Sequence, residues 1–414
     1  MSNQPTGNNG MNNNGTLNAE TQRKSPQGKI LQPKLRFKGF TDPWQQRKYS
    51  DYLIESNIPG HDGSEANKLT VKLWGKGVVE KETVTAGSNA TKYYIRHTGQ
   101  LMYGKLDFLH AAFGLVPPEL DGYESTADSP AFDILPSADP NFILMTCLSK
   151  HTYLYQGNLA DGSRKAKRVH VPTFLDMSLN IPNIEEQYRI VLFLHTIDKL
   201  IAAAKKKADL LKLKKRYYLQ AIFNQRLRFK GFTEPWQQRK LGELFKERSE
   251  RSNQGELISV TITNGVVPAS SLERKDNSSE DKSNYKQVKT GDIAYNTMRM
   301  WQGASGVSPY SGILSPAYTV LIPSSEVSSS FFAQMFKLVR MLHLFQRYSQ
   351  GLTSDTWNLK YPLLSEIRVT IPSLAEQERI SEFLVLNDEL TALVKKKAED
   401  LQKIKSYYLQ QLFV

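Results

Sequence analysis

The chain has 414 residues, a length that suggests two or three domains. Hydrophobic residues make up 40% of it and aromatic residues 10%, which is enough for packed cores and excludes a wholly disordered chain. The net charge of +13 indicates an acidic partner, most often a nucleic acid. The single cysteine, Cys147, excludes an intrachain disulfide. We expect a cytoplasmic protein, because the sequence shows no apolar run of membrane-spanning length and no signal peptide.

The N-terminal segment, residues 1–34, is polar and lacks hydrophobic periodicity. It contains runs such as Asn12-Asn13-Asn14, which offer little apolar surface to offset the entropy of ordering. We predict a disordered tail and assign it no role.

After the tail, the sequence is an internal duplication. Residues 35–48 (LRFKGFTDPWQQRK) return at 227–240 (LRFKGFTEPWQQRK), with Asp42 replaced by Glu234. Residues 181–223 return at 371–413, and about half of the paired residues are identical. Two matches in the same order indicate two units with a common frame and a pseudo-two-fold relation.

The segments between the repeated blocks, 49–180 and 241–370, have diverged. Short β-type runs lie between turn signals, at 69–73, 78–79, 92–96, 258–263, 292–295 and 318–322. Each insert also has an apolar run typical of a helix, 138–150 in the first and 330–348 in the second. We predict two β-rich, mixed α/β domains that share a frame and differ in what they recognise.

The second repeated block predicts a long helix in each unit. Asn183 with Glu186, and Ser373 with Glu376, have the spacing of a capping box. Apolar residues then follow at alternating spacings of three and four, which predicts a coiled-coil seam. The main seam residues are Ile190, Leu194, Ile197, Ile201 and Leu211 in the first helix, and Ile380, Leu384, Val394 and Leu401 in the second.

We expect the two helices to pack against each other, antiparallel under the two-fold relation, with the inserts at opposite ends of the pair. Lys215, Asn387, Thr391 and Lys405 fall at core-type positions, which we interpret as register control or imperfect packing. The first helix is basic in its second half, from Lys199 to Arg216. This indicates either a solvated face or a surface for DNA phosphates or an acidic partner.

Loops of both inserts combine basic, amide and aromatic residues. Arg, Lys, Asn and Gln are the side chains that contact base edges and phosphates. The alternative is a solvated loop with a partly buried Trp. Our candidate DNA-binding residues are Lys92, Arg96, Lys105, Arg164 and Lys165 in the first insert, and Asn296, Thr297, Arg299, Trp301 and Gln302 in the second.

Catalytic motifs are missing from the sequence. Residues 99–105 have the spacing of a phosphate-binding loop, but Leu106 stands where magnesium needs Ser or Thr. The sequence contains no glycine-rich fingerprint for a dinucleotide or a methyl donor and no clustered metal ligands. We therefore predict a non-catalytic chain with no catalytic residues, bound metal or cofactor of its own.

Together, these features resemble the DNA-specificity subunit of type I restriction–modification systems. The resemblance is carried by the Pro-Asn/Ser-x-x-Glu-Gln helix starts, by Thr-Gly-Gln/Asp at 98–100 and 290–292, and by Ser-Pro-Ala-aromatic at 129–132 and 315–318. It implies an α+β architecture, in which a pair of long antiparallel coiled-coil helices separates two target recognition domains. The implied recognition domains are residues 35–180 and 227–370, and the implied spacer helices are 181–226 and 371–414.

By this resemblance, the chain reads a bipartite, asymmetric site in double-stranded DNA. Two modification subunits would carry S-adenosylmethionine and methylate adenine, and restriction subunits would use ATP and magnesium. The alternative is a coiled-coil scaffold whose inserts bind protein partners rather than DNA. The missing motifs disfavour a stand-alone nuclease or methylase.

Overall fold

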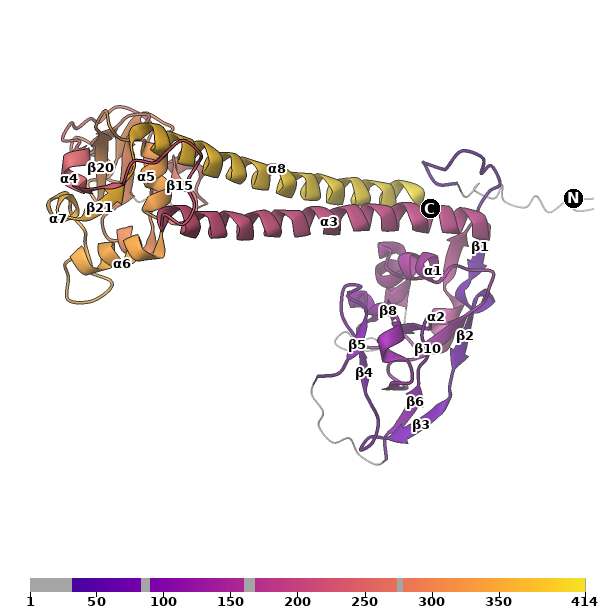
Figure 1. The fold of residues 1–414 in the computed structure, drawn as a ribbon. Helices are drawn as coiled ribbons and strands as arrows, with labels where there is room; N and C mark the ends of the chain where they lie inside the picture. The colour runs from indigo at the N-terminus through magenta and orange to yellow at the C-terminus, as the bar shows by residue number, and fades with distance from the viewer. Residues whose placement is uncertain (1–31, 83–89, 160–167, 274–277, 414) are drawn as a thin grey trace, which may run out of the picture. The chain divides into compact units, whose positions relative to one another are not determined.

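The computed structural model describes residues 32–82, 90–159, 168–273 and 278–413, and most of the predicted tail lies outside them. The chain divides into two compact units (Figure 1). Unit 1 comprises residues 1–198 and 403–414, and unit 2 comprises residues 199–402. Each unit has its own hydrophobic core. No helix among the described residues has the length and apolarity needed to cross a membrane.

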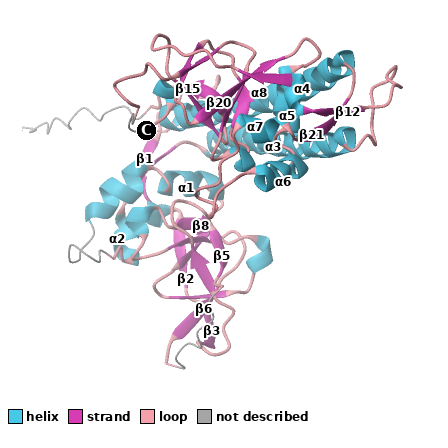
Figure 2. Ribbon diagram, turned by 90° about the vertical axis from the view of Figure 1, so that its left-hand side faces the viewer, coloured by secondary structure: helices cyan, strands magenta, loops and turns pink. Residues whose placement is uncertain are grey.

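Unit 1 is built from short antiparallel strands. Its strands are β1 (Gln45–Lys48), β2 (Leu53–Ser56), β3 (Pro59–Asp62), β4 (Leu69–Val71), β5 (Val78–Glu80), β6 (Lys92–Ile95), β7 (Leu101–Tyr103), β8 (Phe113–Leu115), β9 (Glu124–Thr126), β10 (Ala131–Ile134) and β11 (Ser178–Ile181). They form sheets in the orders β2-β10-β7-β8 and β3-β6-β9, with the pairs β4-β5 and β1-β11. Figure 2 shows helices α1 (Pro140–Cys147) and α2 (Val171–Asp176) at one end of these strands, and β3 and β6 at the other.

Unit 2 repeats this plan with its own details. Its strands are β12 (Gln237–Lys240), β13 (Phe245–Glu247), β14 (Ile258–Thr261), β15 (Gly265–Pro268), β16 (Lys286–Val288), β17 (Ile293–Asn296), β18 (Ser305–Val307), β19 (Gly312–Leu314), β20 (Tyr318–Pro323) and β21 (Arg368–Ile371). The main sheet has the order β13-β20-β17-β18, and the pairs are β12-β21, β14-β15 and β16-β19. Its short helices are α4 (Leu241–Leu244), α5 (Ser329–Met335), α6 (Val339–Tyr348) and α7 (Tyr361–Ser365).

The structure confirms the prediction of a β-rich, mixed α/β fold, and each predicted β-type run overlaps a strand. The single helix predicted over 330–348 is wrong. Leu338 has extended backbone and separates α5 from α6. On either side of this break, α5 buries Phe331, Phe332 and Met335, whereas α6 buries Met341 and Phe345 and exposes Val339.

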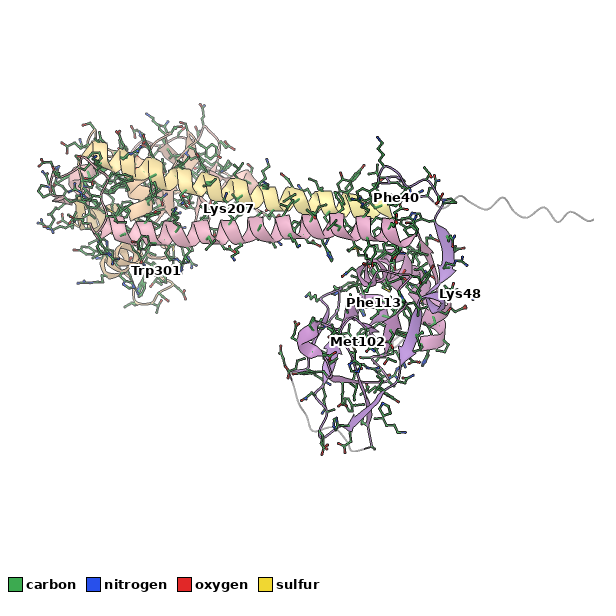
Figure 3. All side chains as sticks on the ribbon, turned by 45° about the vertical axis from the view of Figure 1, so that its right-hand side comes forward. Phe40, Lys48, Met102, Phe113, Lys207 and Trp301 are labelled. Carbon is green, nitrogen blue, oxygen red and sulfur yellow. The ribbon has the colours of Figure 1, made fainter. Side chains whose placement is uncertain are left out.

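Aromatic packing fixes the core of unit 1. Tyr103 and Phe132 stack with their rings nearly parallel and 5.9 Å between centroids, and Phe174 lies 4.8 Å from Tyr103. Met102 and Phe113 are fully buried inside the unit (Figure 3). Because the strands carrying these residues are held by the core, the loops at their ends have a rigid base.

The second repeated blocks form the helices α3 (Ile184–Phe223) and α8 (Leu374–Leu412), of 40 and 39 residues. At 1.5 Å per residue each is about 60 Å long. The backbone N–H of Glu186 donates to Oδ1 of Asn183, as the predicted cap requires. The seam residues of both helices are buried, except Leu211 and Leu401, which are half-buried.

The repeated Glu-Gln pair at each helix start ties that helix to its unit. The Glu186 carboxylate accepts two hydrogen bonds from Arg36, at 2.9 and 2.6 Å. Gln187 accepts from the backbone N–H of Asp139 and donates to the Pro182 carbonyl. A full capping box would also have the Glu186 carboxylate accept from the backbone N–H of Asn183. This part of the prediction is wrong, because the carboxylate instead accepts from the distant Arg36.

Unit 2 repeats these contacts at the start of α8. Arg228 donates to both oxygens of Glu376, at 2.9 and 2.6 Å. Gln377 accepts from the Ser328 N–H and donates to the Pro372 carbonyl. In both units, therefore, the Glu of this pair binds an arginine and the Gln binds backbone groups, and both fasten the start of the long helix to its unit.

Segments of α3 and α8 pack together within each unit. In unit 2, the apolar contacts join Ala204 and Ala208 to Val394 and Ala398. Lys215 forms an ion pair with Asp388 at 2.6 Å, and the Tyr218 and Phe383 rings are 5.0 Å apart. Higher numbers on α3 meet lower numbers on α8, so these segments run antiparallel.

The same pattern appears in unit 1. The Lys405 ammonium lies 2.7 Å from an Asp198 carboxylate oxygen, and the Phe193 and Tyr408 rings are 4.8 Å apart. Lys215 and Lys405, predicted at seam positions, therefore form ion pairs between helices at the edge of the seam. Such pairs favour one register over its neighbours, because a one-turn slip would separate both charges.

Candidate nucleic-acid interface

Equivalent loops in the two units share a backbone frame. The loop after β7 contains the short helix Phe108–His110, and the loop after β17 contains Met300–Gln302. Each short helix buries its first residue and is followed by a left-handed residue, Ala111 with φ 51° or Gly303 with φ 89°. The two loops therefore have a similar backbone that is anchored by a buried residue, and their other side chains project from it.

The exposed side chains of these loops differ in chemistry. Leu106, Asp107 and His110 are exposed in unit 1. In unit 2, Met298 and Arg299 are exposed at the corresponding positions. One frame thus carries an acidic and imidazole surface in one unit and a basic surface in the other.

Local hydrogen bonds hold the unit 2 loop in place. The Trp301 Nε1–H donates to the Met298 carbonyl at 3.1 Å, and the Trp301 ring packs edge-on against Trp357 at 5.2 Å. The Arg299 guanidinium donates to Oε1 of Gln302 at 3.2 Å. Oδ1 of Asn296 accepts from the Met298 N–H. Arg299 is the most exposed of the candidates in this loop, while Asn296, Trp301 and Gln302 are half-buried.

Arg96, a candidate for DNA contact, is a structural residue. Its side chain is 1% exposed and donates to Oγ of Ser125 at 2.8 Å and to the Ser56 carbonyl at 2.6 Å. Burial lowers the pKa of the guanidinium to about 10. This correction follows from the fold, because a guanidinium covered by its own domain offers no surface to a duplex.

Thr297, another candidate for DNA contact, is also a structural residue. It is buried, and its hydroxyl donates to the Ala317 carbonyl at 2.8 Å, which ties the loop to the Ser-Pro-Ala-aromatic segment. Lys92 is exposed on β6, and Lys105 is half-buried at the start of its loop. Arg164 and Lys165 lie outside the described residues.

The Thr-Gly-Asp motif of unit 2 is a structural turn. Asp292 is buried and accepts two hydrogen bonds from Arg248, at 2.7 and 2.9 Å, and one from the Lys289 N–H. In unit 1, Oε1 of Gln100 accepts from the His97 N–H in the matching turn. The motif therefore anchors the strand that leads to the exposed loop.

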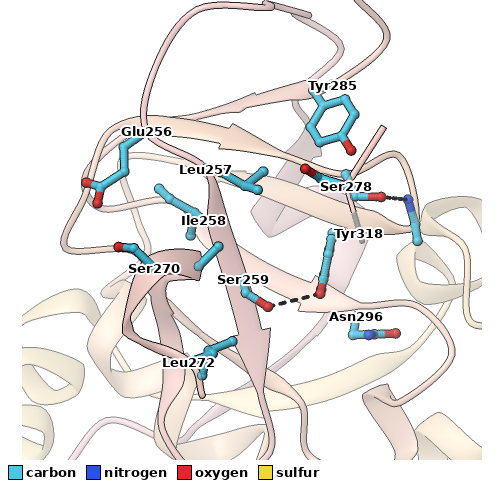
Figure 4. Close-up of a pocket in the computed structure, with 13 residues that line it drawn as sticks. Glu256, Leu257, Ile258, Ser259, Ser270, Leu272, Ser278, Tyr285, Asn296 and Tyr318 are labelled. Atoms are coloured by element: carbon cyan, nitrogen blue, oxygen red, sulfur yellow. Dashed lines mark hydrogen bonds between the residues drawn. The ribbon is translucent and has the colours of Figure 1, made fainter. Parts of the chain in front are cut away.

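A cavity of about 550 Å³ opens beside β14 in unit 2 (Figure 4). Asn296, Tyr318, Ser259 and Tyr285 lie in its lining, and the Ser259 and Tyr318 hydroxyls are 3.2 Å apart. Sequence reasoning identified Asn296 but not the cavity, because its walls come from segments far apart in the chain. Its hydroxyl and amide groups can accept and donate hydrogen bonds.

Sequence reasoning also missed the loop between β4 and β5 in unit 1. Trp74, at its tip, is 58% exposed and has φ 61°. The only local signal was the pair of nearby glycines, Gly75 and Gly77. Among the described residues, the structure shows no group of three or more His, Cys, Asp or Glu side chains placed to hold a metal ion.

Residues 233–403 match the family model of the type I restriction modification DNA specificity domain. This segment is similar to that family. The predicted resemblance to type I specificity subunits is confirmed. The matched segment contains the Arg299 loop, the cavity beside β14 and most of helix α8.

Solved structures share the fold over nearly the whole chain. The S subunit of a type I restriction-modification system from M. genitalium is 15% identical, with a TM-score of 0.53, and the match covers 93% of this chain and 99% of that one. The HsdS subunit from Thermoanaerobacter tengcongensis is 16% identical, with a TM-score of 0.52 and coverages of 89% and 96%.

A third structure comes from work on complex assembly and conformational transition of the type I R-M system. It is 16% identical, with a TM-score of 0.50 and coverages of 89% and 97%. At these identities the likeness concerns the fold. A comparison with curated protein sequences gives no match.

Proposed function

We propose that the chain is the DNA-specificity subunit of a type I restriction–modification system. In this function, residues 35–180 and 227–370 each read one half of a bipartite, asymmetric DNA site. One observation carries the proposal: similar loop frames in the two units expose different side chains, with Asp107 and His110 in one and Met298 and Arg299 in the other. The specificity-domain match over 233–403 supports it.

The division of labour follows from the chemistry of DNA. Phosphate contacts from lysines and arginines supply affinity, and side chains on loops read base edges. The chain itself performs no catalysis in this proposal. Modification subunits supply S-adenosylmethionine and methyl transfer, and restriction subunits supply ATP- and magnesium-dependent cleavage.

The helices α3 and α8 act as the spacer in this proposal. The antiparallel contacts found within each unit support one continuous coiled-coil pair, with the recognition domains as a duplicated set. The lysines of α3 at 199, 205–207, 212 and 214 are exposed and suit a phosphate backbone or an acidic partner surface. Lys207 is labelled on this helix in Figure 3.

A leucine-rich face of the helix pair in unit 2 suits the docking of modification subunits. Four residues of this face each directly precede a residue at a seam position: Leu210 on α3, and Leu386, Leu390 and Leu393 on α8. The residues of the face on each helix therefore lie on one flank of that helix. The two-fold relation of an antiparallel pair brings matching flanks to the same side. The leucine face comprises Leu210 and Tyr217 on α3 and Leu386, Leu390 and Leu393 on α8, all at least 40% exposed.

Charging the leucine face should weaken partner docking. We expect the double variant Leu390→Glu, Leu393→Glu to lose at least tenfold in affinity for the modification subunit, because it places two charges in an apolar interface. Isothermal titration with the purified modification subunit measures this. Ala392→Glu is the matched control, since Ala392 is exposed and follows the seam residue Thr391, on the opposite flank. Equal losses in both variants would remove the face from the docking surface.

Salt-dependent DNA binding tests the function as a whole. A reader that contacts several phosphates should lose affinity steeply between about 50 and 200 mM salt, by 10³-fold or more for six or more contacts. Fluorescence anisotropy with the full chain, its modification subunit and labelled duplex measures this. A shallow salt dependence, with protein binding intact, would instead favour the scaffold alternative.

Arg299 is the best candidate for a base contact in unit 2, because it is exposed on a well-held loop. If Arg299 reads a base, Arg299→Ala should cost about 1–3 kcal/mol on the specific site and relax one position of the motif. If it binds phosphate, all sequences should weaken alike and the salt slope should fall by about one. Binding titrations on matched and mismatched duplexes separate the two, and an unchanged variant would exclude both roles.

A further inference from the structure

The hairpin loop between β4 and β5 holds an exposed tryptophan in a strained conformation. Trp74 has φ 61°, a left-handed backbone that bulky side chains rarely adopt. Three described residues other than glycine have positive φ, and two of them, Trp74 and Ala111, meet at this place. Strain of this kind costs on the order of 1–3 kcal/mol and persists where the surroundings enforce it.

Backbone hydrogen bonds enforce the conformation. The Trp74 N–H donates to the His110 carbonyl, and the Gly75 N–H donates to the Ala111 carbonyl, both at 2.8 Å. The hairpin also lies tightly on β8, where a Cβ on Gly114 would come within 2.8 Å of Gly77 Cα. The hairpin is thus locked to the same loop whose exposed residues include Asp107 and His110.

The Trp74 ring faces solvent despite this rigid support. It is 58% exposed and packs edge-on against the His110 imidazole, with 5.6 Å between centroids. Leu73 is 38% exposed, and Lys72 and Lys76 on either side are exposed as well. The tip therefore offers a flat aromatic ring and an apolar neighbour between two cations.

Unit 2 has the same hairpin with a different tip. The hairpin of β14 and β15 approaches Gly306 closely, since a Cβ there would lie 3.2 Å from the Val266 nitrogen. Its tip exposes Ile262, at 48%, and carries no aromatic residue or lysine over 262–264. The frame of the hairpin does not require a tryptophan, so Trp74 is a property of the first recognition domain alone.

We propose that Trp74 stacks on a nucleobase of the half-site read by unit 1. This inference rests on the proposed function and adds a specificity-determining residue to it. Methylation of an adenine requires that base to leave the stack, which uncovers the faces of its neighbours. An exposed indole ring can cover such a face, and Lys72 and Lys76 on either side can contact the flanking phosphates.

The first test compares Trp74→Ala and Trp74→Phe in the full chain with its modification subunit. The probe is a duplex carrying the motif found methylated in a host that expresses this chain. Stacking on a base contributes about 1–3 kcal/mol, so Trp74→Ala should weaken binding about 5- to 150-fold. Trp74→Phe should retain most of the affinity, and the salt slope should not change, because no charge is removed.

The control is Tyr155→Ala, which removes another aromatic side chain of unit 1 that is 66% exposed. It should bind DNA like the wild type. Wild-type affinity in Trp74→Ala, or equal losses in Trp74→Ala and Tyr155→Ala, would overturn the proposal. Loss of modification-subunit binding by Trp74→Ala without DNA would also overturn it and would mark a protein contact.

A second readout follows the bases of the half-site directly. 2-Aminopurine is placed at each position of the unit 1 half-site in turn, and its fluorescence is read on binding of the wild type. A 2-aminopurine whose neighbour leaves the stack should brighten, so stacking on Trp74 predicts one such position that stays quenched with the wild type and brightens with Trp74→Ala. Equal brightness of the wild type and Trp74→Ala at every position would contradict the proposal. Failure of the proposed function is seen separately, because the wild type itself would then not bind the duplex.

Discussion

Glu186→Ala should lower the free energy of unfolding of unit 1 by about 3–5 kcal/mol, the cost of breaking a buried ion pair by removing one partner. The Glu186 side chain is 1% exposed and accepts two hydrogen bonds from Arg36, whose side chain is 12% exposed. The variant leaves that guanidinium largely buried without its carboxylate. Urea unfolding followed by circular dichroism measures the loss.

Unit 2 supplies a matched test of the same interaction. Glu376→Ala removes the partner of Arg228 and should destabilise unit 2 to a similar extent. Glu185→Ala is the control, because Glu185 is an exposed residue in the first turn of α3, and the expected change is within about 0.5 kcal/mol. A loss below about 1 kcal/mol for both buried glutamates would show that these pairs do not anchor the helices.

Lengthening the helix pair should lengthen the gap between the two half-sites. In the proposed function the pair is the ruler, and half-sites should lie about one duplex turn apart, 34–36 Å between centres. Inserting seven helical residues after Lys207 in α3, and seven after Val394 in α8, preserves the heptad seam and adds about 10.5 Å. At about 3.4 Å per base pair, the gap should grow by up to about three base pairs.

The bases read on either side should stay the same, because the recognition domains are untouched. Methylation assays on duplexes with gaps of different lengths measure the shift. A seven-residue insertion in α3 alone is the control, since it breaks the pairing with α8 and should destabilise the chain. A paired insertion that remains fully active on the original gap would exclude the helices as the ruler.

Local sequence signals predicted the elements that depend on local periodicity. The apolar spacing from Ile190 and from Ile380 located the buried faces of α3 and α8, because a helix buries residues at fixed intervals. The Asn183 cap was predictable for the same reason, since its bond spans three residues.

What sequence reasoning missed depends on contacts between distant residues. Arg96 was predicted to be a surface cation. Its guanidinium instead lies inside the domain and donates hydrogen bonds to the Ser56 carbonyl and the Ser125 hydroxyl. Glu186 looked like half of a capping box, but Arg36 engages its carboxylate from another segment. Trp74 gave no signal beyond the nearby glycines Gly75 and Gly77, because its left-handed backbone is imposed by carbonyls of the 110–111 loop.

Mapping methylated adenines in a host that carries this chain and its modification subunit tests the central claim most directly. The account predicts methylation within one bipartite, asymmetric motif that disappears when the chain is deleted. Replacing residues 241–370 with the corresponding insert of another family member should change one half of that motif and leave the other half and the gap unchanged. A motif in which both halves change together, or methylation that does not depend on the chain, would contradict two independent readers on one specificity subunit.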